Sequence, residues 1–250
     1  MKFMRFIQTA GLSVALFAAL VQTAVHAEPN DYIRTPTVEQ GEKEIDFKWG
    51  AQKNKDGTRE SATSIGLGYG VNSFWFTEIY AKYSRLPGES NAFDAWEWEN
   101  RFQLTETGKY PVDLGFLFEI ERPKNRAEGY ELTYGPLLQS EWGKVQANFN
   151  LLIQKHVQAS TPFNTEMHYQ GQVKYRQAEL FEWGAQAFGS VGQWDRWSAS
   201  TYQEQKFGPA VFGKIRTGTK QAIKWNAALL HGIPNASPQT TLRFQSEYEF

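Results

Sequence analysis

Charged side chains at alternate positions are the residues most able to do chemistry in this 250-residue chain. Residues two apart in an extended chain share one face of a strand, so runs of this kind place like charges side by side. An acidic group contains Glu97, Glu99, Asp113, Glu119, Glu121 and Glu131, with Arg101 among them, and a basic group contains Lys174, Arg176, Lys206, Lys214, Arg216 and Lys224. If the two groups face each other across water, they would attract and select ionic solutes by charge.

Covalent and metal chemistry have few candidate residues. The chain has no Cys, and its four His residues are His26, His156, His168 and His231. A metal site needs a converging cluster of ligands, which scattered His residues do not predict, so no metal or other cofactor is expected. A hydrolase would need a nucleophile within reach of a base, and only His156 and Ser160 share a predicted loop. We therefore predict no catalytic residue and keep a hydrolase as the least favoured reading.

An alternation of apolar and polar residues recurs along residues 44–250 and predicts about twelve β-strands. The mean hydropathy is −0.54 although 41% of the residues are hydrophobic, because the apolar residues are dispersed at every second position. The apolar phase includes Ile45 and Phe47, Ile65 and Leu67, Trp96 and Trp98, Leu114 and Phe116, Phe149 and Leu151, and Leu242 and Phe244. Many runs approach the roughly 9–11 residues that a tilted strand needs to cross a bilayer.

The last nine residues show the alternation most strictly. Leu242, Phe244, Ser246, Tyr248 and Phe250 fall on one face, and polar residues fall on the other. This ending resembles the terminal strand of Gram-negative outer-membrane β-barrels, in which a C-terminal Phe and alternate upstream aromatic residues form the signal read by the barrel-assembly machinery. The resemblance implies an all-β fold, a transmembrane antiparallel up-and-down β-barrel. It also implies outer-membrane lipid and the assembly machinery as partners, with Phe244, Tyr248 and Phe250 as the assembly signal.

The N-terminal residues have the pattern of a secretory leader. Lys2 and Arg5 precede an apolar stretch over residues 12–21, and Ala27 permits cleavage before Glu28. Residues 1–27 are therefore predicted to be a cleaved signal peptide of a protein exported to the outer membrane. Residues 28–43 are polar and are predicted to be a periplasmic N-terminal segment, either a tail or a small plug, with the barrel over residues 44–250.

The predicted connections between strands alternate in length. The longer ones lie at residues 54–60, 85–92, 122–129, 156–164, 194–203 and 232–238, and the shorter ones lie around residues 72, 107–109, 141–143, 178–179 and 217–219. Outer-membrane barrels have short periplasmic turns and longer outer loops, so this parity predicts periplasmic termini. Pro136 and Pro209 fall within predicted strands, and bulges are expected there.

A secreted β-sandwich or lipocalin-like barrel would show the same alternation, but the strand length and the terminal Phe favour the membrane barrel. A barrel of about eight strands is filled by its side chains and one of sixteen holds an aqueous channel, so twelve falls between them. Bulky inward residues would narrow the lumen further, namely Phe76, Tyr80, Leu117, Leu152, Phe188 and Phe212.

The sequence therefore predicts a narrow passive channel, or porin, for small polar or charged solutes. One alternative is a closed structural or adhesive barrel that displays loops such as the one containing Trp194 and Trp197, and a phospholipase-like hydrolase is less favoured. Among twelve-stranded relatives, acidic-oligosaccharide porins look strongly basic inside, whereas this predicted lumen carries both signs. The formal charge of −1 gives no reason to expect a nucleic acid partner.

Overall fold

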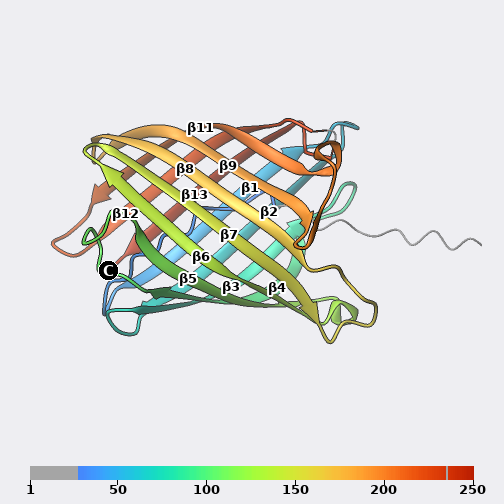
Figure 1. Cartoon of the computed structure of the whole chain (residues 1–250), viewed down its shortest axis with the longest axis horizontal. Helices are drawn as coiled ribbons and strands as arrows, with labels where there is room; N and C mark the ends of the chain where they lie inside the picture. The colour runs from blue at the N-terminus through green and yellow to red at the C-terminus, as the bar shows by residue number, and fades with distance from the viewer. Residues whose placement is uncertain (1–27, 235) are drawn as a thin grey trace, which may run out of the picture.

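The chain forms one antiparallel sheet that closes on itself (Figure 1). The computed structural model describes residues 28–234 and 236–250, and the predicted leader, residues 1–27, lies outside the described residues. The barrel strands are β1 (Lys43–Lys53), β2 (Arg59–Gly70), β3 (Trp75–Arg85), β4 (Ala92–Gln103), β5 (Asp113–Pro123), β6 (Tyr130–Trp142), β7 (Val145–Val157), β8 (Glu166–Ala178), β9 (Phe181–Gln193), β11 (Glu204–Arg216), β12 (Ala222–Gly232) and β13 (Thr240–Glu249). The prediction of an all-β, twelve-stranded antiparallel barrel is confirmed.

Closure depends on the pairing of the first strand with the last. β1 pairs with β13 in antiparallel register over its whole length, with Ala51 opposite Leu242 and Glu44 opposite Glu249. Every other barrel strand pairs with its neighbours in chain order, and the two-residue strand β10 (Arg196–Trp197) only extends the end of β9. The backbone groups of the sheet are therefore satisfied without a free edge, as a bilayer requires of any spanning structure.

The two faces of the wall differ in polarity, as the alternation predicts. Ile65 and Ile79 on the outer face are about half exposed, at 48% and 56%, whereas Asp46 on the inner face is 1% exposed. Aromatic pairs lie near both ends of the strands. Trp75 stacks on Phe102 at one end, and Phe93 packs against Trp96 near the other.

The connections also separate into two ends. The loop end carries residues 54–58, 86–91, 124–129, 158–165, 194–203 and 233–239, and the turn end carries residues 71–74, 104–112, 143–144, 179–180 and 217–221. The connection over residues 104–112 is longer than predicted, because β4 stops at Gln103 and β5 starts only at Asp113. It is ordered by the Asp113 carboxylate, which accepts a hydrogen bond from the Gly108 amide at 2.7 Å.

Two loops contain a single helical turn each, η1 (Arg126–Glu128) and η2 (Ser200–Tyr202). In the part of the chain that the structure describes, no helix is long and apolar enough to cross a membrane.

The expectation of bulges at Pro136 and Pro209 is wrong. Pro136 pairs in register with Phe116 of β5, and Pro209 pairs in register with Ala185 of β9. Each proline only interrupts the pairing with the strand on its other side, where the register resumes unchanged. The reason is that the missing N–H of a strand residue would have pointed to one neighbour only, so the other ladder is intact. The register shifts occur elsewhere, for example between Lys82 and Tyr83.

A cross-link between the first and last strands tests closure, because the chain has no Cys of its own. Ala51→Cys with Leu242→Cys places thiols on directly opposed residues, so oxidation should link them and change the mobility of the boiled, unreduced chain on a gel. Ala51→Cys with Phe244→Cys offsets the pair by two residues and should link far more slowly. Equal linking of both pairs, or no linking of either, would contradict the observed closure.

Candidate functional site in the barrel lumen

Residues 28–42, here called the lumen segment, run inside the barrel before the chain enters β1. The Asn30 amide donates to the Ser64 hydroxyl of β2 at 2.9 Å, and the Val38 amide donates to the Gln103 side chain of β4 at 2.8 Å. Asn150 of β7 donates to the carbonyl of Arg34 at 3.0 Å. These partners come from distant parts of the wall, so the segment crosses the lumen instead of following one side. These contacts place the segment within the barrel.

The lumen segment presents different chemistry to the two sides of the barrel. Tyr32 and Arg34 are buried toward charged residues of β1, β4 and β5. Ile33 between them packs against the opposite side, where an inward apolar cluster consists of Phe188, Ala210, Phe212, Ala228 and Leu230. Adjacent residues of the segment therefore face opposite sides of the lumen.

Two inward-facing glycines of the wall make room for the segment. A Cβ at Gly50 would overlap the carbonyl group of Pro29, and a Cβ at Gly115 would lie 2.8 Å from the Cα of Pro36. Near the turn end, the backbone of the segment also pairs with the wall, because the Gly41 amide donates to the Gly70 carbonyl at 2.8 Å. Residues of the wall therefore help to determine where the lumen segment lies.

Arg34 makes the central ionic contact of the lumen. Its Nε donates to Glu99 Oε2 at 2.9 Å, and its Nη2 donates to Glu119 Oε2 at 2.5 Å. Both carboxylates and the guanidinium group are at least nine-tenths buried. A planar guanidinium with several N–H donors can bridge two carboxylates in this way. The two strands β4 and β5 are thereby joined through a side chain that belongs to neither.

Aromatic rings complete the surroundings of Arg34. Its guanidinium carbon lies 4.5 Å from the centre of the Tyr32 ring, and the Tyr32 hydroxyl donates to Glu99. The Lys48 ammonium lies between two rings, 3.2 Å from the centre of Tyr32 and 3.5 Å from that of Tyr80. Cations held against aromatic faces in this way are stabilised without a full shell of water.

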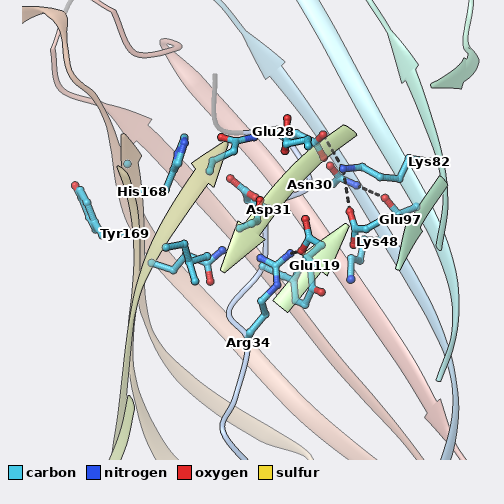
Figure 2. A pocket seen from close by; sticks show the side chains of 18 residues that line it. Glu28, Asn30, Asp31, Arg34, Lys48, Lys82, Glu97, Glu119, His168 and Tyr169 are labelled. Atoms are coloured by element: carbon cyan, nitrogen blue, oxygen red, sulfur yellow. Dashed lines mark hydrogen bonds and ion pairs between the residues drawn. The ribbon is translucent and has the colours of Figure 1, made fainter. Parts of the chain in front are cut away.

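A second ionic cluster lies closer to the loop end, around Lys82 of β3 (Figure 2). The ammonium is 2.9 Å from Glu28, 3.1 Å from Glu97 and 2.5 Å from Glu121. Lys206 of β11 donates to the Glu28 carbonyl at 3.1 Å from across the lumen. The first described residue of the segment is thus bound on two sides.

We define the acidic wall as six of the inward carboxylates of β1, β3, β4 and β5, which are Glu44, Asp46, Glu78, Glu97, Glu99 and Glu119. Three of them, Glu97, Glu99 and Glu119, bring carboxylate oxygens within 4.8 Å of one another, which is close enough to share a cation. The cations in contact with these three are Arg34, Lys82 and Arg101.

The lumen segment separates two cavities. A smaller one of about 130 Å³ lies toward Lys82 and His168, and a larger one of about 450 Å³ is lined by groups such as Glu78 and Lys174. Tyr32 and Arg34 line both cavities. The segment is therefore the partition that interrupts the lumen.

The predicted acidic group lies inside the barrel, with its members in different roles. Glu97 and Glu119 line the smaller cavity, Arg101 lines the larger one, and Glu99 is 1% exposed beneath Arg34. Glu121 contacts Lys82, and Glu131 lies 3.2 Å from the His156 ring. Asp113 stands apart, because it orders the turn over residues 104–112.

The predicted basic group is divided between the larger cavity and the surface. Lys174, Arg176, Lys214 and Lys224 line the larger cavity, and Lys206 is 1% exposed beside the lumen segment. Their ion pairs are local, for example Lys174 with Glu182 at 3.0 Å and Lys224 with Glu247 at 3.1 Å. Arg216 lies at the end of β11, where its 61% exposed side chain pairs with Glu179.

The residues considered for catalysis and assembly also have definite places. His156 contacts Glu131 and the Glu128 carbonyl, and its ring stacks on Phe163. His168 lines the smaller cavity. Phe244 and Tyr248 lie on the outer face of β13, and Phe250 directly follows the strand, with the Tyr248 and Phe250 rings stacked at 5.5 Å between centres.

Several central residues were missed by the sequence reasoning. Glu44, Asp46, Lys48, Glu78 and Lys82 fall in the inward phase of β1 and β3, and the same alternation rule identifies them. The sequence contains no such signal for Tyr32 and Arg34. The lumen segment lacks the alternation of apolar and polar residues that predicts a strand and the direction of its side chains.

The barrel is similar to several solved outer-membrane channels, although no protein-family model and no curated protein matches the sequence. An outer-membrane channel from Pseudomonas putida F1 aligns with a TM-score of 0.60 and 10% identity, over 90% of this chain and 100% of that one. The KdgM porin aligns with a TM-score of 0.56 and 9% identity, over 83% and 99%. The NanC porin aligns with a TM-score of 0.54 and 9% identity, over 82% and 98%. At these identities the likeness shows a shared barrel fold.

Lys82→Met tests the ionic cluster around Lys82. The substitution removes the cation that faces Glu28, Glu97 and Glu121, and breaking a buried ion pair typically costs about 3–5 kcal/mol. The temperature at which the folded band converts to the unfolded band on a gel should fall, and adding Glu97→Gln should restore part of the loss. Lys144→Met in an exposed turn is the matched control and should leave the temperature unchanged. Equal conversion temperatures for Lys82→Met and the unaltered chain would contradict the cluster.

Proposed function

We propose that this chain is an outer-membrane channel, or porin, for small charged solutes, and that the lumen segment restricts its passage. The observation that supports the proposal best is the combination of an apolar outer face with a charged inner wall that encloses two cavities. A structure that only anchors loops needs no such lining, whereas charged walls are how pores select solutes. The shared fold with outer-membrane channels is consistent with this proposal.

The larger cavity supports a preference for charged solutes. It presents carboxylates from the acidic wall and basic side chains such as Lys174 and Lys224 to the same space. One KdgM porin structure is a complex with oligogalacturonate, so a barrel of this fold can hold a charged solute. In this chain the acidic wall would repel a polyanion, which favours small solutes over long anionic chains.

The proposal includes the location and processing of the chain. Export would remove residues 1–27, leaving Glu28 at the new N-terminus inside the lumen. The outward aromatic residues Phe244 and Tyr248 of β13, together with Phe250 directly after the strand, would be available to the assembly machinery and then to lipid. The turn end would face the periplasm and the loop end the exterior.

The lipid-facing surface can be tested with two matched substitutions. Ile65 in the middle of β2 and Leu86 in a connection at the loop end are similarly exposed, at 48% and 50%. Ile65→Arg would place a charge near the bilayer midplane at a cost of about 2–4 kcal/mol, whereas Leu86→Arg would stay in water. Ile65→Arg should therefore reduce the folded amount in outer-membrane fractions and Leu86→Arg should not. Equal yields of both variants would indicate that the outer face does not meet lipid.

Conductance in planar bilayers tests transport directly. We expect a small conductance from the purified chain, and a shift of its reversal potential toward cation preference when Lys174, Lys214 and Lys224 are all replaced by Gln. These lysines line the larger cavity, and substitutions in a lumen tune its selectivity.

The matched control replaces three exposed lysines of the turn end, Lys109, Lys144 and Lys220, by Gln. It changes the net charge equally and should leave the reversal potential unchanged. A complete lack of conductance in every variant, including one without residues 28–38, would contradict the channel and favour the closed structural or adhesive barrel.

A further inference from the structure

We infer that the pocket around Glu99 and Glu119 is a binding site for a solute that carries a guanidinium group, and that Arg34 occupies it as an internal ligand. The inference rests on the proposed channel function, because the solute must reach the pocket through the lumen. It adds a ligand class and names the residues that recognise it.

The pocket belongs to the strands, whereas its occupant comes from outside them. Glu99 and Glu119 are fixed on β4 and β5, and they pair with Arg34 from a segment that has no strand pairing of its own around that residue. If the segment leaves the lumen, both carboxylates keep their places on the wall and lose a cation. A pocket that is formed by the wall and filled by a tethered group can also accept a free solute with the same group.

The excess of carboxylates over cations on the acidic wall favours the binding of a cation in the pocket around Glu99 and Glu119. The strand cations near the acidic wall are Lys48, Lys82 and Arg101, which are fewer than its carboxylates. Glu78 is 2% exposed and lines the larger cavity, and its Oε1 accepts no hydrogen bond from the residues that the structure describes. An unpartnered buried carboxylate oxygen beside a cavity is a further acceptor for a cationic solute.

The geometry favours a guanidinium group over a simple ammonium group. Arg34 contacts Glu99 through Nε and Glu119 through Nη2, so two donors of one plane reach two separate carboxylates. An ammonium ion is a compact point charge and does not present donors in this fixed arrangement.

The site can be tested by removing the internal ligand and supplying a free one. Arg34→Ala leaves a space between the two carboxylates, and methylguanidinium should fill it and raise the unfolding temperature of the folded barrel. At ten times its dissociation constant a ligand should raise this temperature by about 3–5 °C in a chain of this size. Methylammonium should have a smaller effect, and neither ion should stabilise Arg126→Ala, which removes an exposed arginine in a loop.

A second variant keeps the test decisive if Arg34→Ala folds poorly. Deletion of residues 28–38 removes the whole occupant and should give a larger, cation-preferring conductance that methylguanidinium blocks more strongly than methylammonium. Adding Glu99→Gln and Glu119→Gln to the deletion should abolish that difference.

The outcomes separate the inference from the proposed function. Equal effects of the two ions on Arg34→Ala and on the deletion variant would overturn the guanidinium site while leaving a conducting channel. Selective stabilisation by methylguanidinium without any conductance would support the site and overturn the channel.

Discussion

The neutralisation of buried carboxylates is the interaction on which the rest of this structure depends. A closed barrel points every second side chain into a confined space, so the inward acids of β1, β3, β4 and β5 are largely withdrawn from water. An unpaired buried charge is strongly destabilising, and each must find a cation or a donor nearby. Lys48, Lys82 and Arg101 supply part of the balancing charge from the wall, and Arg34 adds a further cation from the lumen segment.

This requirement makes the lumen segment part of the fold as well as part of the proposed channel. The segment fills the space between the acidic wall and the apolar cluster around Phe188, and it separates the two cavities. Transport past Arg34 would require the lumen segment to be displaced. A displacement that removes Arg34 would expose Glu99 and Glu119. A cationic solute that replaces Arg34 offsets that exposure, which couples solute binding to opening of the lumen.

The sequence predicts the wall well because a single physical rule governs it. The alternation predicts both the strands and which of their side chains point inward. It places Glu97, Glu99 and Glu119 inside the barrel, and it also identifies inward residues that were overlooked, such as Asp46 and Glu78. The alternation rule does not apply to segments that are outside the β-sheet and are not positioned by strand pairing. Arg34 lies in a segment held by side chains and tight backbone approach, and no periodic pattern marks such contacts.

The same limit explains the other differences. The first and last residues of the connection over residues 104–112 continue the alternating pattern of the strands. The connection is nevertheless held outside the sheet by the hydrogen bond from the Gly108 amide to Asp113 and by the bonds from the Leu104 and Thr105 amides to the Leu114 carbonyl. Pro136 and Pro209 disturb only one neighbour each, because the loss of an N–H is directional. The direction of each side chain in a strand can be predicted from the local sequence. The contacts of the irregular lumen segment depend on the tertiary structure of the whole barrel.

The most direct test of the central claim is an NMR measurement on arginine side chains. In a ¹⁵N-arginine-labelled barrel in lipid nanodiscs, the Nε–H of Arg34 should exchange slowly with water at neutral pH, because it donates to Glu99 in a buried site. That resonance should disappear in Arg34→Lys and should exchange faster in Glu99→Gln. If no slowly exchanging Nε–H depends on Arg34 and Glu99, the guanidinium group does not lie on the acidic wall and the account is contradicted.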